Sequence, residues 1–548
     1  MKQKLIKVHP DDNVLVALTD LSAGEELRYE GALYTVKEAI PAKHKFPVHD
    51  LSAGDTVIMY GVMVGKAQTD IAAGSLLTTA NLKHAAGGYS YRAAAPDWTA
   101  PDVTKFAGRH FNGYHRSNGE VGTANYWLFI PTVFCENRNL DVIKEALHNE
   151  LGYAVTPKYK QYTRQLIAAY QAGENLDTID LSPATAASQP TSRLFKNIDG
   201  IKFLNHQGGC GGIRQDAAVL SKLLAAYAAH PNVAGVTVLS LGCQNLQVQD
   251  FRNDLQNLYP DFDKPLFIFE QQQSQGEEQL IADAIKKTFE GLIGANMIRR
   301  QPAPLSKLCI GVKCGGSDGF SGISANPSVG YCSDLLVALG GKVLLAEFPE
   351  LCGVEQNLID RTMEAAAAKK FISLMSAYSK AAENAGSGFH MNPSPGNIKD
   401  GLITDAMKSA GAARKGGTSP VVDVLDYTER ATKPGLSLVC TPGNDVEATT
   451  GKAASGATLI LFTTGLGTPT GNPVCPTIKV STNSNLTRRM NDIIDIDTGP
   501  VIEGEKTIQQ MGEEILEYCI KAASGEIIPK AVLLNQDDFI PWKRGVSL

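Results

Sequence analysis

Hydrophobic and polar positions follow a period of two at the start of the chain. Short alternating runs such as NVLVAL and TVIMYG are separated by a repeated turn motif, DLSAG at 20–24, DLSAG again at 50–54 and DIAAG at 70–74. Alternation of this kind predicts half-buried strands, and the glycine that closes each motif predicts a tight turn. We therefore expect residues 1–86 to form a small all-β domain of hairpins.

The pattern changes after an aperiodic segment, AAGGYSYRAAAPDWTAP, which is rich in Ala, Gly and Pro. We expect a linker at 87–104, a smaller α/β domain at 105–280 and a Rossmann-like C-terminal domain at 281–548. Helices are predicted at about 277–293 and 357–384. Apolar runs that predict buried, mainly parallel strands alternate with helical segments: VAGVTVLSLG, KPLFIFE, LCIGVKCG, KVLLAEF, GLSLVCTPG, ATLILFTTG and TIKVSTN.

Each apolar run is followed at once by polar or glycine-rich residues, such as GGSDGFSG, PELCGVEQ and NDVEATTG. In open α/β sheets, ligands bind outside the carboxyl ends of the strands. These segments should therefore converge on one crevice.

Composition narrows the classes of function. Hydrophobic residues make up 43% of the chain, charged residues 20%, and the net charge is -6. Without a dense basic stripe or a long apolar run, we expect neither nucleic acid nor a membrane as partner. The 10 cysteines are scattered, with no CxxC pair, and the first residues do not resemble a signal peptide. These features favour a reducing compartment, and we expect a cytoplasmic protein.

Candidate chemistry lies in several motifs. CGGSDGFSG, at 314–322, offers a thiol and a carboxylate on a loop whose glycines let backbone N–H groups approach an anion. EFPELCGVEQ places Glu347, Glu350 and Glu355 after another strand, where carboxylates can hold a cation, act as acid and base, or face solvent.

NHQGGCGG brings His206 close to Cys210, as a ligand pair or as a buried thiol beside a capping histidine. Arg116, in GYHRSNGEVGTAN, is suited to clamp a substrate carboxylate, although an Arg in a loop is more often solvated.

These motifs, in this order, resemble the altronate and galactarate dehydratase family over almost the whole chain. AKHKFPVHDLSAGDTVIMYG resembles the family's small SAF-type β-clip domain, and NGYHRSNGEVGTANYWLFIPTVFC resembles the opening of its second domain. The ending DDFIPWKRGVSL, together with PGNDVEATTG, favours the altronate branch. Further segments follow in the order expected of the family: HPNVAGVTVLSLGCQNLQ, CGGSDGFSGISANPSVG, NPSPGN, LFTTGLGTP and PTIKVSTNS.

The resemblance implies a metal-dependent hydro-lyase acting on a sugar acid. D-Altronate is the expected substrate, and galactarate or another aldonate or aldarate is the alternative. It implies Fe²⁺, with Mn²⁺ as a second choice, and a homodimer. We expect the metal at Cys314, Asp318, Glu347 and Glu350. His206, Asp318 and Glu350 are the expected catalytic groups. Arg116, Asn125, Ser317, Asn326 and Asn397 are expected to bind the substrate.

Other classes stay open on sequence alone. An NAD-linked dehydrogenase would use a similar crevice, but the dinucleotide fingerprint is missing. An iron–sulfur dehydratase would need Cys210, Cys243 and Cys314 to meet. A non-enzymatic sugar-acid binding protein is the remaining alternative.

Overall fold

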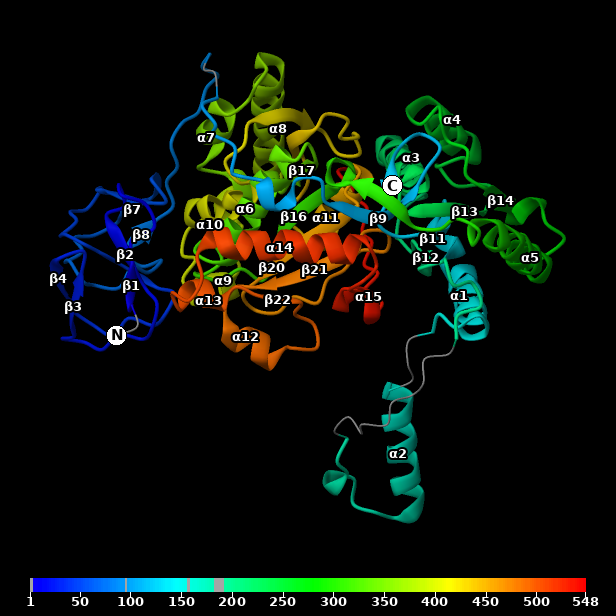
Figure 1. The fold of residues 1–548 in the computed structure, drawn as a ribbon, viewed down its shortest axis with the longest axis horizontal. Coiled ribbons are helices and arrows are strands. Elements are labelled where there is room, and N and C mark those ends of the chain that lie inside the picture. Colours follow the sequence, from blue (N-terminus) through cyan, green and yellow to red (C-terminus); the bar gives the residue numbers. More distant parts are fainter. Residues whose placement is uncertain (1–2, 94–95, 155–157, 182–191) are drawn as a thin grey trace.

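The structure, a computed structural model, describes residues 3–93, 96–154, 158–181 and 192–548. An all-β N-terminal domain lies at one end of the molecule, a large α/β domain in the middle and a smaller α/β domain at the other end (Figure 1). The fold class predicted from the sequence is confirmed.

The N-terminal domain is built from short antiparallel hairpins, in sheets of order β1-β2-β5, β3-β4 and β6-β7-β8. The glycines that end the repeated motifs, Gly24, Gly54 and Gly74, have φ values of 79°, 95° and 80°. This left-handed conformation explains the glycine in each turn. The strands are β1 Leu5–Ile6, β2 Val14–Ala17, β3 Glu26–Tyr29, β4 Ala32–Thr35, β5 Lys45–Pro47, β6 Thr56–Met59, β7 Val62–Ala67 and β8 Leu82–Lys83.

The second domain has a parallel sheet of order β12-β11-β13-β14. Its strands are β11 Tyr126–Pro131, β12 Gly200–Phe203, β13 Val233–Ser240 and β14 Leu266–Glu270. Its helices are α1 Asn137–Leu151, α2 Lys158–Ala172, α3 Arg214–Ala229, α4 Val248–Leu258 and α5 Glu277–Ala295. Helix α5 packs against β13 and β14.

The C-terminal domain contains a larger parallel sheet of order β18-β19-β17-β16-β20-β21-β22. Its strands are β16 Cys309–Cys314, β17 Lys342–Leu345, β18 Val421–Leu425, β19 Gly435–Val439, β20 Leu459–Thr464, β21 Thr477–Ser481 and β22 Ile496–Asp497. Each predicted apolar run is therefore a strand. A separate antiparallel sheet joins β9 His110–His115 to β10 Val121–Gly122 and β15 Gln301–Pro304.

Helices cover both faces of the larger parallel sheet of the C-terminal domain (Figure 1). The helix predicted at 357–384 is interrupted, since α7 Glu355–Asp360 and α8 Ala365–Asn384 are separate. The remaining helices are α6 Ala325–Ala338, α9 Pro395–Lys399, α10 Asp405–Ala413, α11 Asp445–Ala454, α12 Ser484–Arg489, α13 Gly499–Ile502, α14 Ile508–Ala523 and α15 Lys530–Leu533.

Shared hydrophobic clusters join the domains. Leu128 and Tyr227 of the second domain pack in one cluster with Phe462 of the C-terminal domain. Val57 of the N-terminal domain packs in another with Phe320 and Met407. Burial of apolar surface between domains therefore fixes the loops that follow the central strands.

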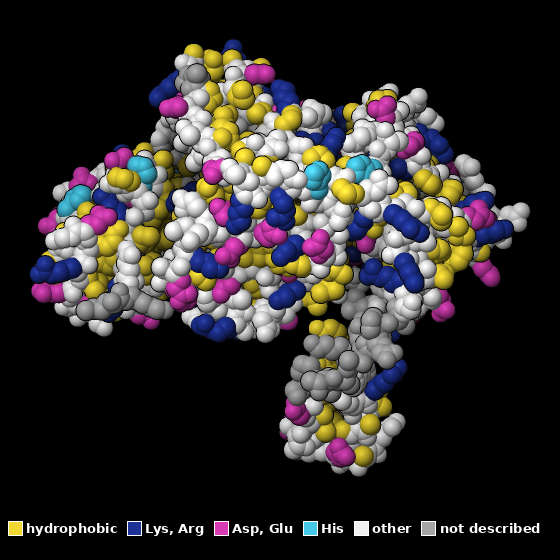
Figure 2. All heavy atoms as spheres, viewed as in Figure 1, with side chains coloured by type: hydrophobic (Ala, Val, Ile, Leu, Met, Phe, Trp, Pro, Cys, Tyr) yellow, Lys and Arg dark blue, Asp and Glu magenta, His cyan; other side chains and the backbone are white. Residues whose placement is uncertain are grey.

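Within the described ranges, we find no helix whose length and apolar character would let it traverse a bilayer. On the face seen in Figure 2, basic and acidic side chains are interspersed.

Candidate active site

The candidate site lies at the carboxyl ends of β16, β17, β19 and β20. Strand β17 flanks β16 on one side and β20 flanks it on the other, so the order of the strands reverses between β16 and β20. A reversal of this kind opens a crevice in which ligands of α/β proteins bind.

Glycines after the strands let these loops approach one another closely. The backbone N–H of Gly465, after β20, donates to the carbonyl of Gly316, after β16. A Cβ at Gly315 would lie 2.5 Å from the carboxylate oxygens of Asp445. The glycine-rich motif therefore serves close packing around the carboxylates.

Cys314, Glu347 and Glu350 come together at this rim. Their ligand atoms all lie within 4.8 Å of one another, and the residues are buried. The Cys314 Sγ donates to Glu350 Oε2 at 3.4 Å. Glu347 has a φ of 73°, an unfavourable conformation for a residue with a Cβ, and its backbone N–H donates to Thr441 Oγ1 at 3.0 Å. Strain of about 1–2 kcal/mol is retained here to aim this carboxylate.

Buried lysines surround the cluster. The Nζ of Lys415 lies 2.6 Å from Cys314 Sγ and 3.2 Å from Glu347 Oε2. Lys313 pairs with Glu347 Oε1 and with Asp445 Oδ1, and Lys408 Nζ lies 2.9 Å from Glu350 Oε1. The Nζ of Lys452 lies 3.7 Å from Glu347 Oε2. The negative groups are thus neutralised by ammonium groups in a site shielded from water.

These neighbours control the proton affinities. Burial acts to raise the pKa of Glu350, but the ammonium groups of Lys408, Lys313 and Lys415 outweigh it and hold that pKa at about 2. Burial raises the pKa of the Cys314 thiol to about 11. Glu350 is therefore an anion at neutral pH, whereas Cys314 carries its proton.

A cavity of about 570 Å³ opens onto this cluster. Cys314, Glu350 and Lys408 line it on one side. Ser317, Asn392, Asn397 and Asp445 are among the polar residues that line the rest. The cavity combines anionic, cationic and amide groups, which suits a small polyhydroxy acid.

Comparison with known proteins identifies the family. Models of its parts match residues 3–85 ("Altronate/galactarate dehydratase SAF domain"), 113–296 ("D-galactarate dehydratase/Altronate hydrolase, second domain") and 305–547 ("D-galactarate/Altronate dehydratase, C-terminal"). The altronate dehydratase of Escherichia coli (strain K12) is 34% identical, with 99% of each chain covered. The chain belongs to the altronate and galactarate dehydratase family.

Other members of this dehydratase family are similarly related. The altronate dehydratase of Bacillus subtilis (strain 168) is 33% identical, with 100% of both chains covered. The L-threo-forming galactarate dehydratase of Escherichia coli (strain K12) is 31% identical over 95% of this chain and 93% of its own. The family and the N-terminal SAF domain expected from the sequence are confirmed.

Asp318 does not join the cysteine–glutamate cluster, although we expected it among the ligands. Its Oδ2 lies 3.0 Å from the Nζ of Lys43 in the SAF domain and accepts from Thr482 Oγ1 at 3.1 Å. Its Oδ1 accepts from Ser321 Oγ at 3.1 Å. The loop turns this carboxylate toward the SAF domain, where it anchors an interdomain contact.

The predicted substrate-binding residues near the rim differ in what they can reach. Ser317 and Asn397 line the cavity, and the Asn397 Nδ2 donates to the Ser317 carbonyl at 2.8 Å. Asn326, in the first turn of α6, is buried and donates to the Gly411 carbonyl at 3.0 Å. It accepts from Thr463 Oγ1 at 2.6 Å, so its amide is occupied within the protein.

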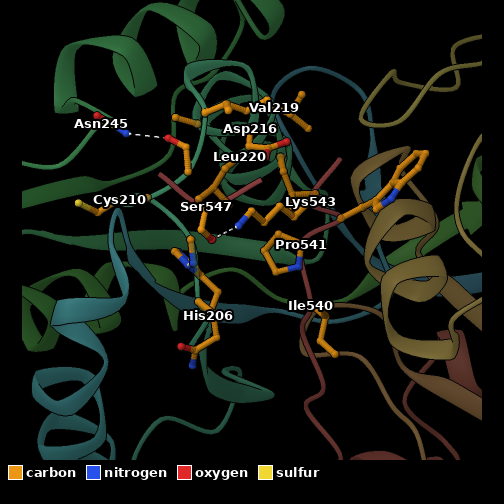
Figure 3. A pocket seen from close by; sticks show the side chains of 18 of the residues that line it. His206, Cys210, Asp216, Val219, Leu220, Asn245, Ile540, Pro541, Lys543 and Ser547 are labelled. Atoms are coloured by element: carbon orange, nitrogen blue, oxygen red, sulfur yellow. Dashed lines mark hydrogen bonds between the residues drawn. The ribbon is translucent and has the colours of Figure 1, made fainter. Parts of the chain in front are cut away.

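His206 lies in the second domain, in a different cavity of about 370 Å³ together with Cys210 and Lys543 (Figure 3). Its Nε2 donates to the Pro131 carbonyl at 2.8 Å and its Nδ1 accepts from the Gly208 N–H at 3.0 Å. Burial lowers its pKa to about 4. Both ring nitrogens are engaged in holding the backbone, an arrangement typical of a structural histidine.

Arg116 and Asn125 also lie in the second domain. Arg116 Nε donates to the Pro231 carbonyl at 2.7 Å, and its Nη2 donates to Asn125 Oδ1 at 3.0 Å. Asn125 Nδ2 donates to the Asn197 carbonyl at 2.8 Å. These contacts tie the β9–β10 hairpin to the domain, and neither residue lines the cavity beside Cys314.

Sequence reasoning missed the lysines of the site. A lysine in a strand or helix is usually read as solvated, yet Lys313 is fully buried within β16. The available signal was its position inside the continuous apolar run LCIGVKCG, where both faces of a central strand are covered.

Proposed function

We propose that this protein dehydrates a sugar acid in the cavity beside Cys314, with D-altronate as substrate and 2-dehydro-3-deoxy-D-gluconate as product. The proton α to the carboxylate is removed and the neighbouring hydroxyl leaves as water, giving an enol that becomes the keto acid. Galactarate, the substrate in the name of one relative, is the alternative. The observation that carries this proposal is the pairing of Glu350 with Lys408 at the cavity wall.

Lys408 and Glu350 supply complementary functions. When the Lys408 ammonium group turns to the substrate carboxylate, Glu350 loses the neighbour that most lowers its pKa. The pKa of Glu350 then rises, although Lys313 and Lys415 still lower it. The Oε1 that Lys408 releases is free to remove the proton as a general base, while Oε2 faces Cys314 in the cation site. Ser317, positioned by a hydrogen bond from Asn397, orients the hydroxyl groups, and Lys408 holds the substrate carboxylate.

Cys314, Glu347 and Glu350 fit a divalent cation by the type and closeness of their donors. A thiolate and carboxylates whose donor atoms lie within 4.8 Å suit Fe²⁺, and Mn²⁺ is the alternative that hard oxygen ligands favour. When bound there, the cation would supply positive charge that stabilises the carboxylate as the α-proton leaves. Cys314 must lose its proton, and Lys415 must move from the sulfur, before the thiolate can coordinate.

The test is an anaerobic assay of metal-depleted protein supplied with Fe²⁺ or Mn²⁺ and with D-altronate, galactarate or related aldonates, reading keto-acid formation. D-Altronate should give the highest kcat/KM. Glu350→Gln, which keeps the shape of the side chain, should lower kcat at least 100-fold. Activity of Glu350→Gln close to that of the unaltered protein would remove this cavity from the mechanism.

A further inference from the structure

A second group of potential ligands lies between the SAF and C-terminal domains. It consists of His84, which follows β8, Cys352, which follows Phe348–Leu351, and Asp405, which opens α10. Their ligand atoms all lie within 4.8 Å of one another. The group shares no residue with Cys314, Glu347 and Glu350.

Asp405 is the observation that points to a bound cation. The residue is fully buried, and the Cys352 thiol approaches its carboxylate. Among the described residues, neither carboxylate oxygen has a hydrogen bond of good geometry. A buried carboxylate without compensation is costly, and native proteins satisfy such groups with a donor, a cation or water.

The nearby lysine compensates this carboxylate only in part, by lowering its pKa against the effect of burial. Lys408, one helical turn further along α10, pairs with Glu350 Oε1 at 2.9 Å and donates to Asn392 Oδ1 at 2.6 Å. Its ammonium group is therefore committed to the catalytic cavity.

The other donors are suited to a metal. Cys352 and His84 are both partly exposed, so an ion can reach them from the surface. The Nδ1 of His84 accepts from the Ala406 N–H at 3.3 Å, a long contact that coordination can replace. Imidazole, thiolate and carboxylate together form a donor set of borderline softness, which Zn²⁺ accepts with a water molecule in the fourth position.

We propose that His84, Cys352 and Asp405 bind a divalent transition-metal ion of the zinc type, which clamps the SAF domain to α10. Tetrahedral coordination requires side-chain adjustments that shorten the present separations. The site goes beyond the proposed dehydration, since it joins domains and does not line the cavity of the reaction.

The first experiment titrates the metal-depleted full-length protein anaerobically with Co²⁺, whose absorption reports thiolate ligation and tetrahedral geometry. It uses the Cys314→Ser background, so that the catalytic cluster contributes no thiolate. We expect a thiolate-to-cobalt band in Cys314→Ser that disappears in Cys314→Ser/Cys352→Ser and persists in Cys314→Ser/Cys210→Ser. A band that survives removal of Cys352, or no band in Cys314→Ser, overturns the proposal.

A second measurement leaves Cys314 in place, in case its replacement prevents folding. Asp405→Asn removes the carboxyl ligand while keeping the shape of the side chain, and it should fold at least as well as the unaltered protein. Its affinity for Zn²⁺ at this site should fall at least tenfold, and the rise in Tm caused by Zn²⁺ should be smaller than in the unaltered protein. An equal rise in Tm in both proteins would contradict the proposal that Asp405 binds the metal ion.

Discussion

The Nζ of Lys43, in the SAF domain, lies 3.0 Å from the Oδ2 of Asp318, in the loop after β16. The same ammonium group lies 3.0 Å from Asp400 Oδ1, after α9. A neighbouring buried lysine, Lys45, donates to the Gly401 carbonyl at 2.7 Å. Through these contacts the SAF domain holds segments that lie near the cavity beside Cys314.

Replacement of Lys43 should destabilise the protein. Lys43→Met leaves the fully buried Asp318 carboxylate without its ion pair, which should lower the free energy of unfolding by about 3 kcal/mol. Urea denaturation measures the change, with Lys37→Met, at an exposed position of the same domain, as the control. Equal stability of the two variants would show that the Lys43 pair contributes little.

Removal of the Lys408 ammonium group should weaken substrate binding. Lys408→Met deprives the cavity of the cation that we assign to the substrate carboxylate, so KM for D-altronate should rise at least tenfold. The pKa of Glu350 should rise too, because Lys408 is the neighbour that lowers it most. The pH profile of kcat/KM checks this second effect, and an unchanged KM argues against the assignment.

A methyl group at Gly315 should disturb the site more than the fold. In Gly315→Ala the new Cβ meets the Asp445 carboxylate, which must then move away from Lys313 at 2.9 Å. We expect kcat to fall at least tenfold. The matched control is Gly294→Ala in α5, where a Cβ meets nothing within 4 Å and the change should be neutral or slightly stabilising. Similar activity in both variants would contradict the proposal that the loop after β16 forms part of the active site.

His206 should make the fold sensitive to acid. Burial lowers its pKa to about 4, below the value of about 6.5 in an unfolded chain, so the folded state binds fewer protons between these values. The contribution of neutral His206 to the free energy of unfolding, about 3 kcal/mol, is fully present above pH 6.5 and is lost as the pH falls to about 4.

In His206→Asn, the free energy of unfolding should therefore vary less over this range, as urea denaturation at several pH values can measure. His110→Asn, at an exposed histidine, is the control. A large loss of kcat in folded His206→Asn would instead support the catalytic role expected from the sequence.

Sequence patterns specify the strands and one rim of the sheet well. Buried parallel strands appear as continuous apolar runs. The residues that follow such strands lie at one edge of the sheet, so the sequence predicts that Cys314, Glu347 and Glu350 are close in space. The direction of Asp318 depends on a partner in another domain, Lys43, which no local pattern encodes.

Side chains that satisfy the protein's own backbone are equally hard to recognise in advance. Arg116 and His206 have the chemistry of functional groups, yet their donors and acceptors are occupied by carbonyls and N–H groups of distant segments. The identity of such partners follows from tertiary packing and not from spacing along the chain.

The hydrophobic cluster shared by the SAF and C-terminal domains has a consequence for truncation. Phe320, Ile323, Ile403 and Met407 belong to the C-terminal domain but are buried in a cluster with residues of the first 85. A chain begun at residue 105 would expose them as one apolar patch beside the loop that follows β16, and self-association of the shortened protein would follow.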